Sequence, residues 1–198
     1  MNSFVLAGAL VAGSVYITLC IQIARGTPQN FATWVLWAMI DIVATMSIAS
    51  TKGNFLLPLV YAAGSIATAT TIFLVFRKFQ WTSVETMTAV LVVFCLATYL
   101  LLGGEAGTIV STISVGIAGI PQAGDLWMKP RENSYSVLLV YTGFLASNVF
   151  TAIGGRYWSI EERYYPVFCA VMCMVIVYVI ARGIALRRRF LPEPLVSN

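Results

Sequence analysis

Residues 33–50 read TWVLWAMIDIVATMSIAS, an apolar run with one carboxylate, Asp41, near its centre. A charged side chain at the middle of a bilayer costs about 2.5–3.5 kcal/mol even on permissive insertion scales, so such residues face a bundle interior or a wet cavity. The sequence places no lysine or arginine at a similar depth in another run. Asp41 therefore has two interpretations: a residue of a binding site or pathway, or a protonated acid hydrogen-bonded to a neighbouring helix.

Similar apolar runs occupy most of the chain on both sides of this one. Of the 198 residues, 59% are hydrophobic and 10% are charged, whereas soluble domains carry about 25% charged residues. A spanning helix needs about 20 apolar residues, and the seven segments that qualify or nearly so are residues 3–24, 33–50, 55–76, 83–102, 106–127, 136–154 and 164–186. We therefore predict an all-α, polytopic membrane protein with seven transmembrane helices and no cleavable signal peptide.

The lysines and arginines predict the orientation of these helices, because cytoplasmic loops are enriched in both residues. With the N-terminus outside, nine of the 12 fall on the cytoplasmic side and only Lys52, Arg156 and Arg163 fall outside. The sequence thus predicts a multi-pass cell-membrane protein with a cytoplasmic C-terminus. The arginines at 187–189 anchor this topology or bind anionic lipid. The net charge of +4 lies mostly at these helix ends and gives no reason to expect nucleic acid as a partner.

A weak internal repeat appears when the first three segments are laid on the last three. Placing residues 3–24 on 106–127 also places 33–50 on 136–153, and a short insertion then aligns Pro58 with Pro166. The predicted architecture is a single membrane domain, 1–198, with repeat one at 1–78, a linker helix at 83–102 and repeat two at 106–189. A single linker helix leaves both repeats in the same orientation, and such parallel repeats typically bracket a site near the midplane.

Two Pro-Gln pairs, Pro28-Gln29 and Pro121-Gln122, occur within this pattern. A three-plus-one-plus-three arrangement with these pairs resembles the PQ-loop/SWEET transporter superfamily. The resemblance implies a helix-breaking motif inside the fifth helix, where Pro121 and Gln122 stand, and proline there removes a backbone hydrogen bond and creates a hinge. By register Pro121 corresponds to Thr18, so the first repeat lacks the helix-embedded motif.

Two longer stretches carry a closer likeness. Residues 23–34, IARGTPQNFATW, and residues 127–134, WMKPRENS, resemble small bacterial inner-membrane proteins of unassigned function. This resemblance covers most of the chain and implies a bacterial inner-membrane location. It implies a fold but no definite substrate, because SWEET-like relatives carry sugars and vitamin-precursor carriers share the architecture.

The candidate binding residues lie on two helical stripes. Trp34, Trp37, Asp41, Thr45 and Ile48 share one face of the second segment, and Tyr141, Asn148 and Thr151 share a face of the sixth. From these we predict a substrate-binding set of Asp41, Asn148, Trp37, Thr45 and Tyr141. The family resemblance implies that such a pocket uses tryptophan and asparagine. The alternatives are an interhelical hydrogen bond for Asn148 and an interfacial aromatic belt for Trp34 and Trp37.

The residue types argue against an enzyme. The chain has no histidine, and its lysines all lie in predicted loops, which excludes a Ser-His-Asp triad and a retinal Schiff base in the seventh helix. We expect no catalytic residues, no cofactor and no metal site. The four cysteines lie inside apolar segments, which argues against disulfides; Cys169 and Cys173 share a helix face, and packing is favoured there over a soft-metal site.

The function that these observations favour is transport of a small polar solute, sugar-like or vitamin-like, by alternating access, with proton coupling through Asp41 as an open option. The alternative is a membrane receptor or assembly subunit that does not transport. The expected partners are a small-molecule substrate and the lipid bilayer, and the sequence leaves open whether the chain forms a homo-oligomer.

Overall fold

The computed structural model describes residues 2–27, 29–77, 81–130 and 134–190. Pro28, Lys78 and Arg131, which contribute to the predictions above, lie outside these ranges. The described chain is helical, in the order α1 Ser3–Ala24, α2 Phe31–Ser50, α3 Leu56–Phe76, α4 Ser83–Leu102, α5 Gly104–Met128, α6 Tyr135–Gly154, η2 Ile160–Tyr164 and α7 Tyr165–Phe190. Among the described residues, seven helices are long and apolar enough to cross a membrane, as predicted.

Local capping explains where the helices begin. The side chain of Asn30 accepts a hydrogen bond from the amide of Ala32, so α2 starts two residues before the predicted boundary. Ser134 caps α6 in the same way. The predicted turn before the fifth helix is shorter than expected, because only Gly103 separates α4 from α5, with φ of 89°. A positive φ of this kind favours glycine. The seventh helix is longer than predicted and follows the π-helical turn η2.

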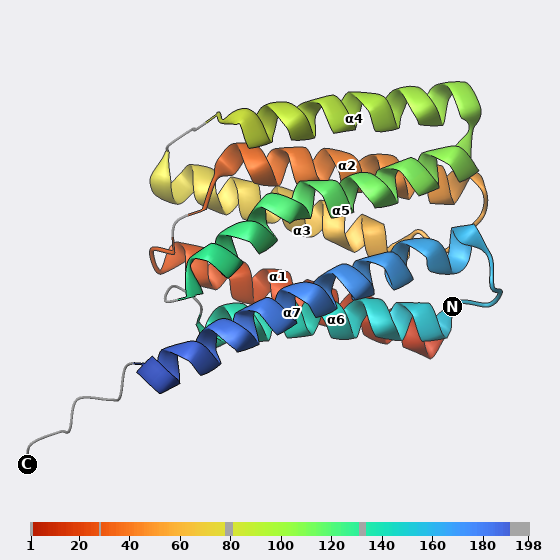
Figure 1. Ribbon diagram of the computed structural model, residues 1–198. Helices are drawn as coiled ribbons and strands as arrows, with labels where there is room; N and C mark the ends of the chain where they lie inside the picture. The colour runs from red at the N-terminus through yellow and green to blue at the C-terminus, as the bar shows by residue number, and fades with distance from the viewer. Residues whose placement is uncertain (1, 28, 78–80, 131–133, 191–198) are drawn as a thin grey trace, which may run out of the picture.

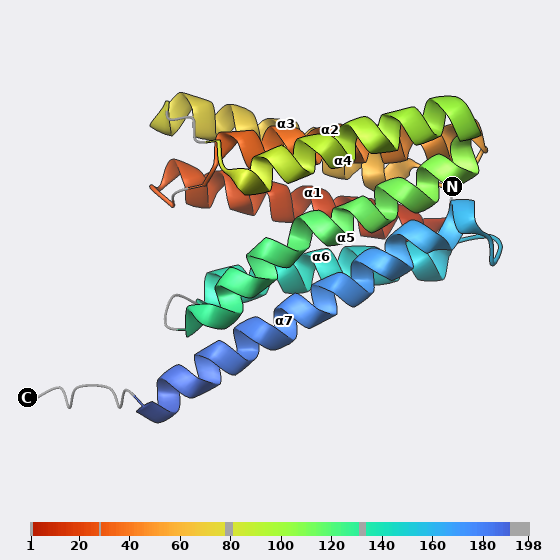
Figure 2. The same cartoon turned by 45° about the horizontal axis from the view of Figure 1, so that its top comes forward.

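We call α1–α3 and α5–α7 the two groups of the bundle; α4 lies on its outside (Figures 1 and 2). α3 packs against both α1 and α2, and α7 packs against both α5 and α6. α1 also packs on α6, and α2 packs on α5, so the two groups meet along two helix pairs. α4 covers α2 and α5. The odd-numbered helices run one way along the bundle and the even-numbered helices run the other way.

Small residues bring the two groups close together. A Cβ atom added at Gly8 of α1 would lie 2.7 Å from the carbonyl oxygen of Ser147 in α6. At the other pair, a Cβ atom added at Gly104 of α5 would lie 2.6 Å from the carbonyl oxygen of Ser47 in α2. Close backbone approach through small residues is typical of helix packing in membranes.

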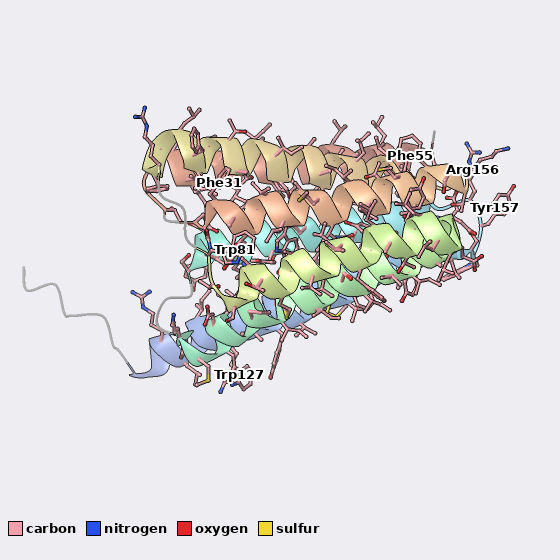
Figure 3. The ribbon with its side chains drawn as sticks, turned by 90° about the horizontal axis from the view of Figure 1, so that it is seen from above. Phe31, Phe55, Trp81, Trp127, Arg156 and Tyr157 are labelled. Carbon is pink, nitrogen blue, oxygen red and sulfur yellow. The ribbon has the colours of Figure 1, made fainter. Side chains whose placement is uncertain are left out.

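Aromatic side chains lie at both ends of the bundle (Figure 3). We call the end where α7 finishes the C-terminal end and the opposite end the N-terminal end. Phe31, Trp81 and Trp127 lie toward the C-terminal end, and Phe55, Arg156 and Tyr157 lie toward the N-terminal end. Between the ends, large apolar side chains are exposed along the outer helix faces, Val90, Val93 and Phe94 of α4 among them.

Candidate functional site

A cavity of about 440 Å³ lies between the two groups of helices. This volume is within the range of small-molecule sites. Side chains from all seven long helices line it. The polar and aromatic ones are Tyr16, Gln29, Asn30, Thr33, Trp34, Trp37, Asp41, Tyr61, Thr82, Glu85, Gln122, Asp125, Tyr141, Phe144 and Asn148.

The cavity reaches the surface at the C-terminal end. There its lining residues Gln29, Thr82, Gln122 and Asp125 are exposed. At depth the lining is buried. Within the described part of the chain, no residue from the connections at the N-terminal end lines the cavity. A solute could therefore enter this conformation from the C-terminal end.

Asp41 lies on the deep wall and is 2% exposed. One oxygen of its carboxyl group accepts a hydrogen bond from the hydroxyl of Tyr165 in α7, at 2.8 Å. The expected partners Asn148 and Tyr141 line the same cavity but do not bond Asp41. No described lysine or arginine pairs with Asp41. The position of Asp41 thus agrees with the sequence prediction of an inward-facing carboxyl without a cation, and its hydrogen-bond partner is Tyr165.

Asn148 takes part in a directed chain of hydrogen bonds. Its side-chain amide donates to the hydroxyl of Tyr61 at 2.6 Å and to the carbonyl oxygen of Phe144 at 2.8 Å. Ser147 also donates to the Phe144 carbonyl, so the 2.9 Å contact between Tyr61 and Ser147 is a bond donated by the tyrosine. The interhelical bond considered for Asn148 therefore exists, and it reaches α3.

The other amide atom of Asn148, Oδ1, is buried and has no hydrogen-bond partner. Exchanging the nitrogen and oxygen of this amide would set an oxygen against the Phe144 carbonyl, so the donor contacts fix its orientation. Buried polar atoms without partners are rare and often mark a position that a ligand or water fills. Asn148 is itself 0% exposed and lines the cavity.

Aromatic rings form much of the cavity wall. The ring of Tyr16 packs edge to face on Phe144, with centroids 5.2 Å apart, and on Trp34, with centroids 6.3 Å apart. Tyr141 packs edge to face on Phe144 at 6.2 Å. Trp34 and Trp37, for which a membrane-interface position was the alternative, are half-buried and line the cavity.

A second carboxylate, Glu85, lies at the mouth. It is 3% exposed and lies in the first turn of α4. It accepts hydrogen bonds from Asn30 at 2.8 Å, from the hydroxyl of Thr33 at 2.6 Å, and from both the amide and the hydroxyl of Thr82. Glu85 thus joins α4 to the start of α2, and donors occupy both of its oxygens.

Two predicted site features differ in the structure. Thr45 does not line the cavity, because its hydroxyl donates to the carbonyl oxygen of Asp41 in its own helix, at 2.7 Å. Threonine in an apolar helix commonly satisfies its hydroxyl in this way. Pro121 and Gln122 do line the cavity, but Pro121 does not break α5, which continues as a helix from Gly104 to Met128. The carbonyl four residues before Pro121 nonetheless lacks its usual amide donor.

Sequence reasoning missed Tyr61, Tyr165 and Glu85. The tyrosines stand in apolar runs where an aromatic residue usually packs, and their partners are 86 to 124 residues away along the chain. For Glu85 a local signal exists: Thr82 followed three residues later by glutamate is a capping-box pattern, and the structure forms that box.

Cys169 and Cys173, considered as soft-metal ligands, both line the cavity as free thiols. Within the described ranges, no group of three or more cysteine, aspartate or glutamate side chains is arranged to hold a metal ion.

The chain matches no protein-family model, no curated protein and no solved structure. The likeness to the PQ-loop/SWEET superfamily consequently stays a prediction from the residues, and the geometry of the site carries the argument about function.

Proposed function

We propose that this chain is a membrane carrier that moves a small polar solute by alternating access, and that it is a PQ-loop/SWEET-like protein of the bacterial inner membrane. In this proposal α1–α3 and α5–α7 are parallel repeats joined by the linker helix α4. The observation that carries the proposal is a cavity between the two groups that opens at one end of the bundle and is closed at the other.

The helix packing supports the repeat. Within each group the third helix packs against the first two, and between groups α1 meets α6 as α5 meets α2. Exchanging the two groups leaves this set of neighbours unchanged. Because α1 and α5 run in the same direction, the exchange corresponds to a rotation about the long axis of the bundle (Figure 1).

The outer surface supports insertion in a bilayer. Exposed side chains such as Leu10, Phe94 and Leu101 would cost free energy in water and none in lipid tails. Trp81 and Trp127 at one end, with Tyr157 at the other, fit the aromatic belts of a membrane protein (Figure 3).

Two tyrosines each form hydrogen bonds from one group to the other on the side of the cavity away from its mouth, and in this proposal they close that end. Tyr165 of α7 bonds Asp41 of α2, and Tyr61 of α3 bonds both Asn148 and Ser147 of α6. A neutral hydrogen bond such as those of Tyr61 contributes about 1 kcal/mol net, and a bond to a carboxylate such as that of Asp41 contributes about 1.5–3 kcal/mol. A rocking motion that breaks them while closing the mouth would transfer the cavity to the N-terminal end.

Transport is tested by screening purified protein for ligands by thermal shift, since a ligand stabilises the folded state by mass action. Each hit is then assayed for counterflow in proteoliposomes. A carrier exchanges labelled solute across the bilayer, and empty liposomes do not. Ligand binding without exchange would contradict transport and favour the receptor alternative.

Proton coupling through Asp41 is part of the proposal, because Asp41 is the deepest carboxyl of the cavity and has no cationic partner in the described chain. In the Asp41→Asn variant, the uptake that remains should no longer respond to a pH gradient. If this variant retains the full pH response, proton coupling through Asp41 is contradicted. Glu105→Asn, at an exposed position at the N-terminal end of α5, is the control.

A further inference from the structure

Resting on the carrier proposed above, we propose that the solute is a small organic cation with N–H donors, a protonated amine, held between Asp41 and Asn148. Three independent features of the cavity lead to this class: the sign of its charges, the unfilled acceptor on Asn148 and the aromatic wall.

Among the described residues, every charged side chain that lines the cavity is acidic. Its lining includes Asp41 at depth and Glu85 and Asp125 at the mouth, and no lysine or arginine of the described residues lines it. A concave site with charges of one sign and low-dielectric walls concentrates ions of the opposite sign. A cationic solute is attracted at the mouth and again at depth.

The carboxylates have different capacities for a ligand. Glu85 already accepts four hydrogen bonds from Asn30, Thr33 and Thr82, so it adds negative potential but has little room for another donor. Asp41 accepts one, from Tyr165. Because a buried carboxylate is stable when it is both paired and hydrogen-bonded, an ammonium group beside Asp41 would supply the missing charge.

The unpartnered oxygen of Asn148 further restricts the class of solute that the cavity can bind. Asn148 Oδ1 can only accept, and the donors of the same amide are committed to Tyr61 and Phe144. A ligand that satisfies this oxygen must bring an N–H or O–H group. A protonated amine carries both the positive charge for Asp41 and the donors for Asn148, whereas a quaternary ammonium group lacks the donor.

The aromatic wall favours a cation as well. Trp34, Trp37 and Tyr16 line the same cavity as Asp41. The negative face of an aromatic ring attracts a cation within about 6 Å, most strongly for tryptophan. These rings also bury the apolar part of an amine, which a sugar would not offer to the same extent.

The test compares two matched pairs in which only an amine is exchanged for a hydroxyl: tyramine against tyrosol, and 1,4-diaminobutane against 1,4-butanediol. Binding to the purified full-length protein is measured by isothermal titration calorimetry at pH 7. Each amine should bind at least about tenfold more tightly than its alcohol. The interaction energy of a single charge pair in a partly buried site is larger than the free-energy difference that corresponds to this ratio. Asp41→Asn should reduce the affinity for the amine to that for the alcohol.

Two further variants distinguish the effect of a lost negative charge on binding from an effect of disturbed folding. Asp125→Asn, at the exposed mouth, should weaken amine binding about twofold and leave alcohol binding unchanged. Glu105→Gln, an exposed acid outside the cavity, should change neither.

Equal affinity for amine and alcohol, or tighter binding of the alcohol, overturns the cation proposal and leaves the carrier intact if counterflow of the alcohol is observed. Tight amine binding without counterflow supports the cation site and contradicts transport. If no member of either pair binds, the cation proposal is wrong, and the ligand screen then decides the carrier separately.

Discussion

At the scale of single residues, the carboxylate of Glu85 determines how α4 is attached to the bundle. Its two oxygens accept from two α2-side residues, Asn30 and Thr33, and from the α4 cap, Thr82. Hydrogen bonds to a charged group contribute about 1.5–3 kcal/mol each, and an amide in place of one oxygen would face a donor. The mouth of the cavity therefore depends on this one side chain.

We predict that Glu85→Gln lowers the free energy of unfolding by about 1–3 kcal/mol. The measurement is denaturant unfolding in detergent, followed by tryptophan fluorescence. Glu105→Gln is the matched control, since Glu105 also lies in the first turn of a helix, α5, but is exposed. Equal effects of the two substitutions would mean that the hydrogen bonds of Glu85 contribute little to the free energy of unfolding.

Asp41 illustrates what single residues reveal in advance and what they do not. Its depth in an apolar run predicted an inward position near Trp37, Tyr141 and Asn148, and all four line one cavity. The partner of Asp41 could not be predicted, because the hydroxyl of Tyr165 comes from a helix whose rotation depends on packing against η2 and α5. Thr45 lies on the same helix face as Asp41, but its hydroxyl donates to the carbonyl oxygen of Asp41 in its own helix. Helical periodicity alone does not predict this hydrogen bond.

At the scale of helices, the apolar runs were sufficient to predict the seven long helices of the described chain, because in a membrane a run of this length satisfies its backbone as a helix. The boundaries moved by a few residues where caps such as Asn30 and Ser134 extended a helix. Which helices become neighbours depends on close contacts such as Gly8 with Ser147, and these pair residues far apart in the chain.

The two tyrosine connections should control access from the N-terminal end. In a background with only Cys173, which lines the cavity, we predict that Tyr61→Phe combined with Tyr165→Phe raises labelling from that end by about fivefold or more. The basis is that each lost hydrogen bond contributes about 1 kcal/mol or more to the closed arrangement. Labelling with a membrane-impermeant cationic methanethiosulfonate in intact cells measures the rate.

Tyr178→Phe is the control for this experiment, because Tyr178 lies in the same helix as Tyr165 but faces outward, 64% exposed. Labelling that responds equally to this control, or not at all to the double variant, would show that the tyrosines do not close the cavity.

We also predict that Pro121 acts as a hinge in α5. Alanine at this position restores the backbone donor and stabilises a straight helix by about 3 kcal/mol. We expect Pro121→Ala to retain ligand binding by calorimetry while counterflow falls severalfold, because α5 lines the cavity and packs on α2, α4 and α7. Gly124→Ala also stiffens α5, in open space beside the same cavity wall, and should have a smaller effect. A proline variant with unchanged counterflow would contradict the hinge.

At the scale of the whole molecule, the distribution of charge and the shape of the cavity together predict which compartment the open end of the cavity faces. Arg25, Arg77 and Lys129 lie at the C-terminal end with Arg187, where the cavity opens, whereas Lys52 and Arg156 lie at the other end. Since loops rich in lysine and arginine stay in the cytoplasm, the described conformation is open to the cytoplasm when the chain is inserted in this orientation.

This orientation predicts the behaviour of two reporter fusions. Green fluorescent protein joined after Asn198 should fluoresce, because it folds in the cytoplasm, and alkaline phosphatase joined after Gly53, between α2 and α3, should be active, because it folds outside. Exchanging the two reporters should abolish both signals. The result also tests the cavity argument, since the reverse orientation would place the acidic mouth with Glu85 and Asp125 on the outer face. The conformation described here would then be the outward-open one, and the tyrosine pairs would close the cytoplasmic end.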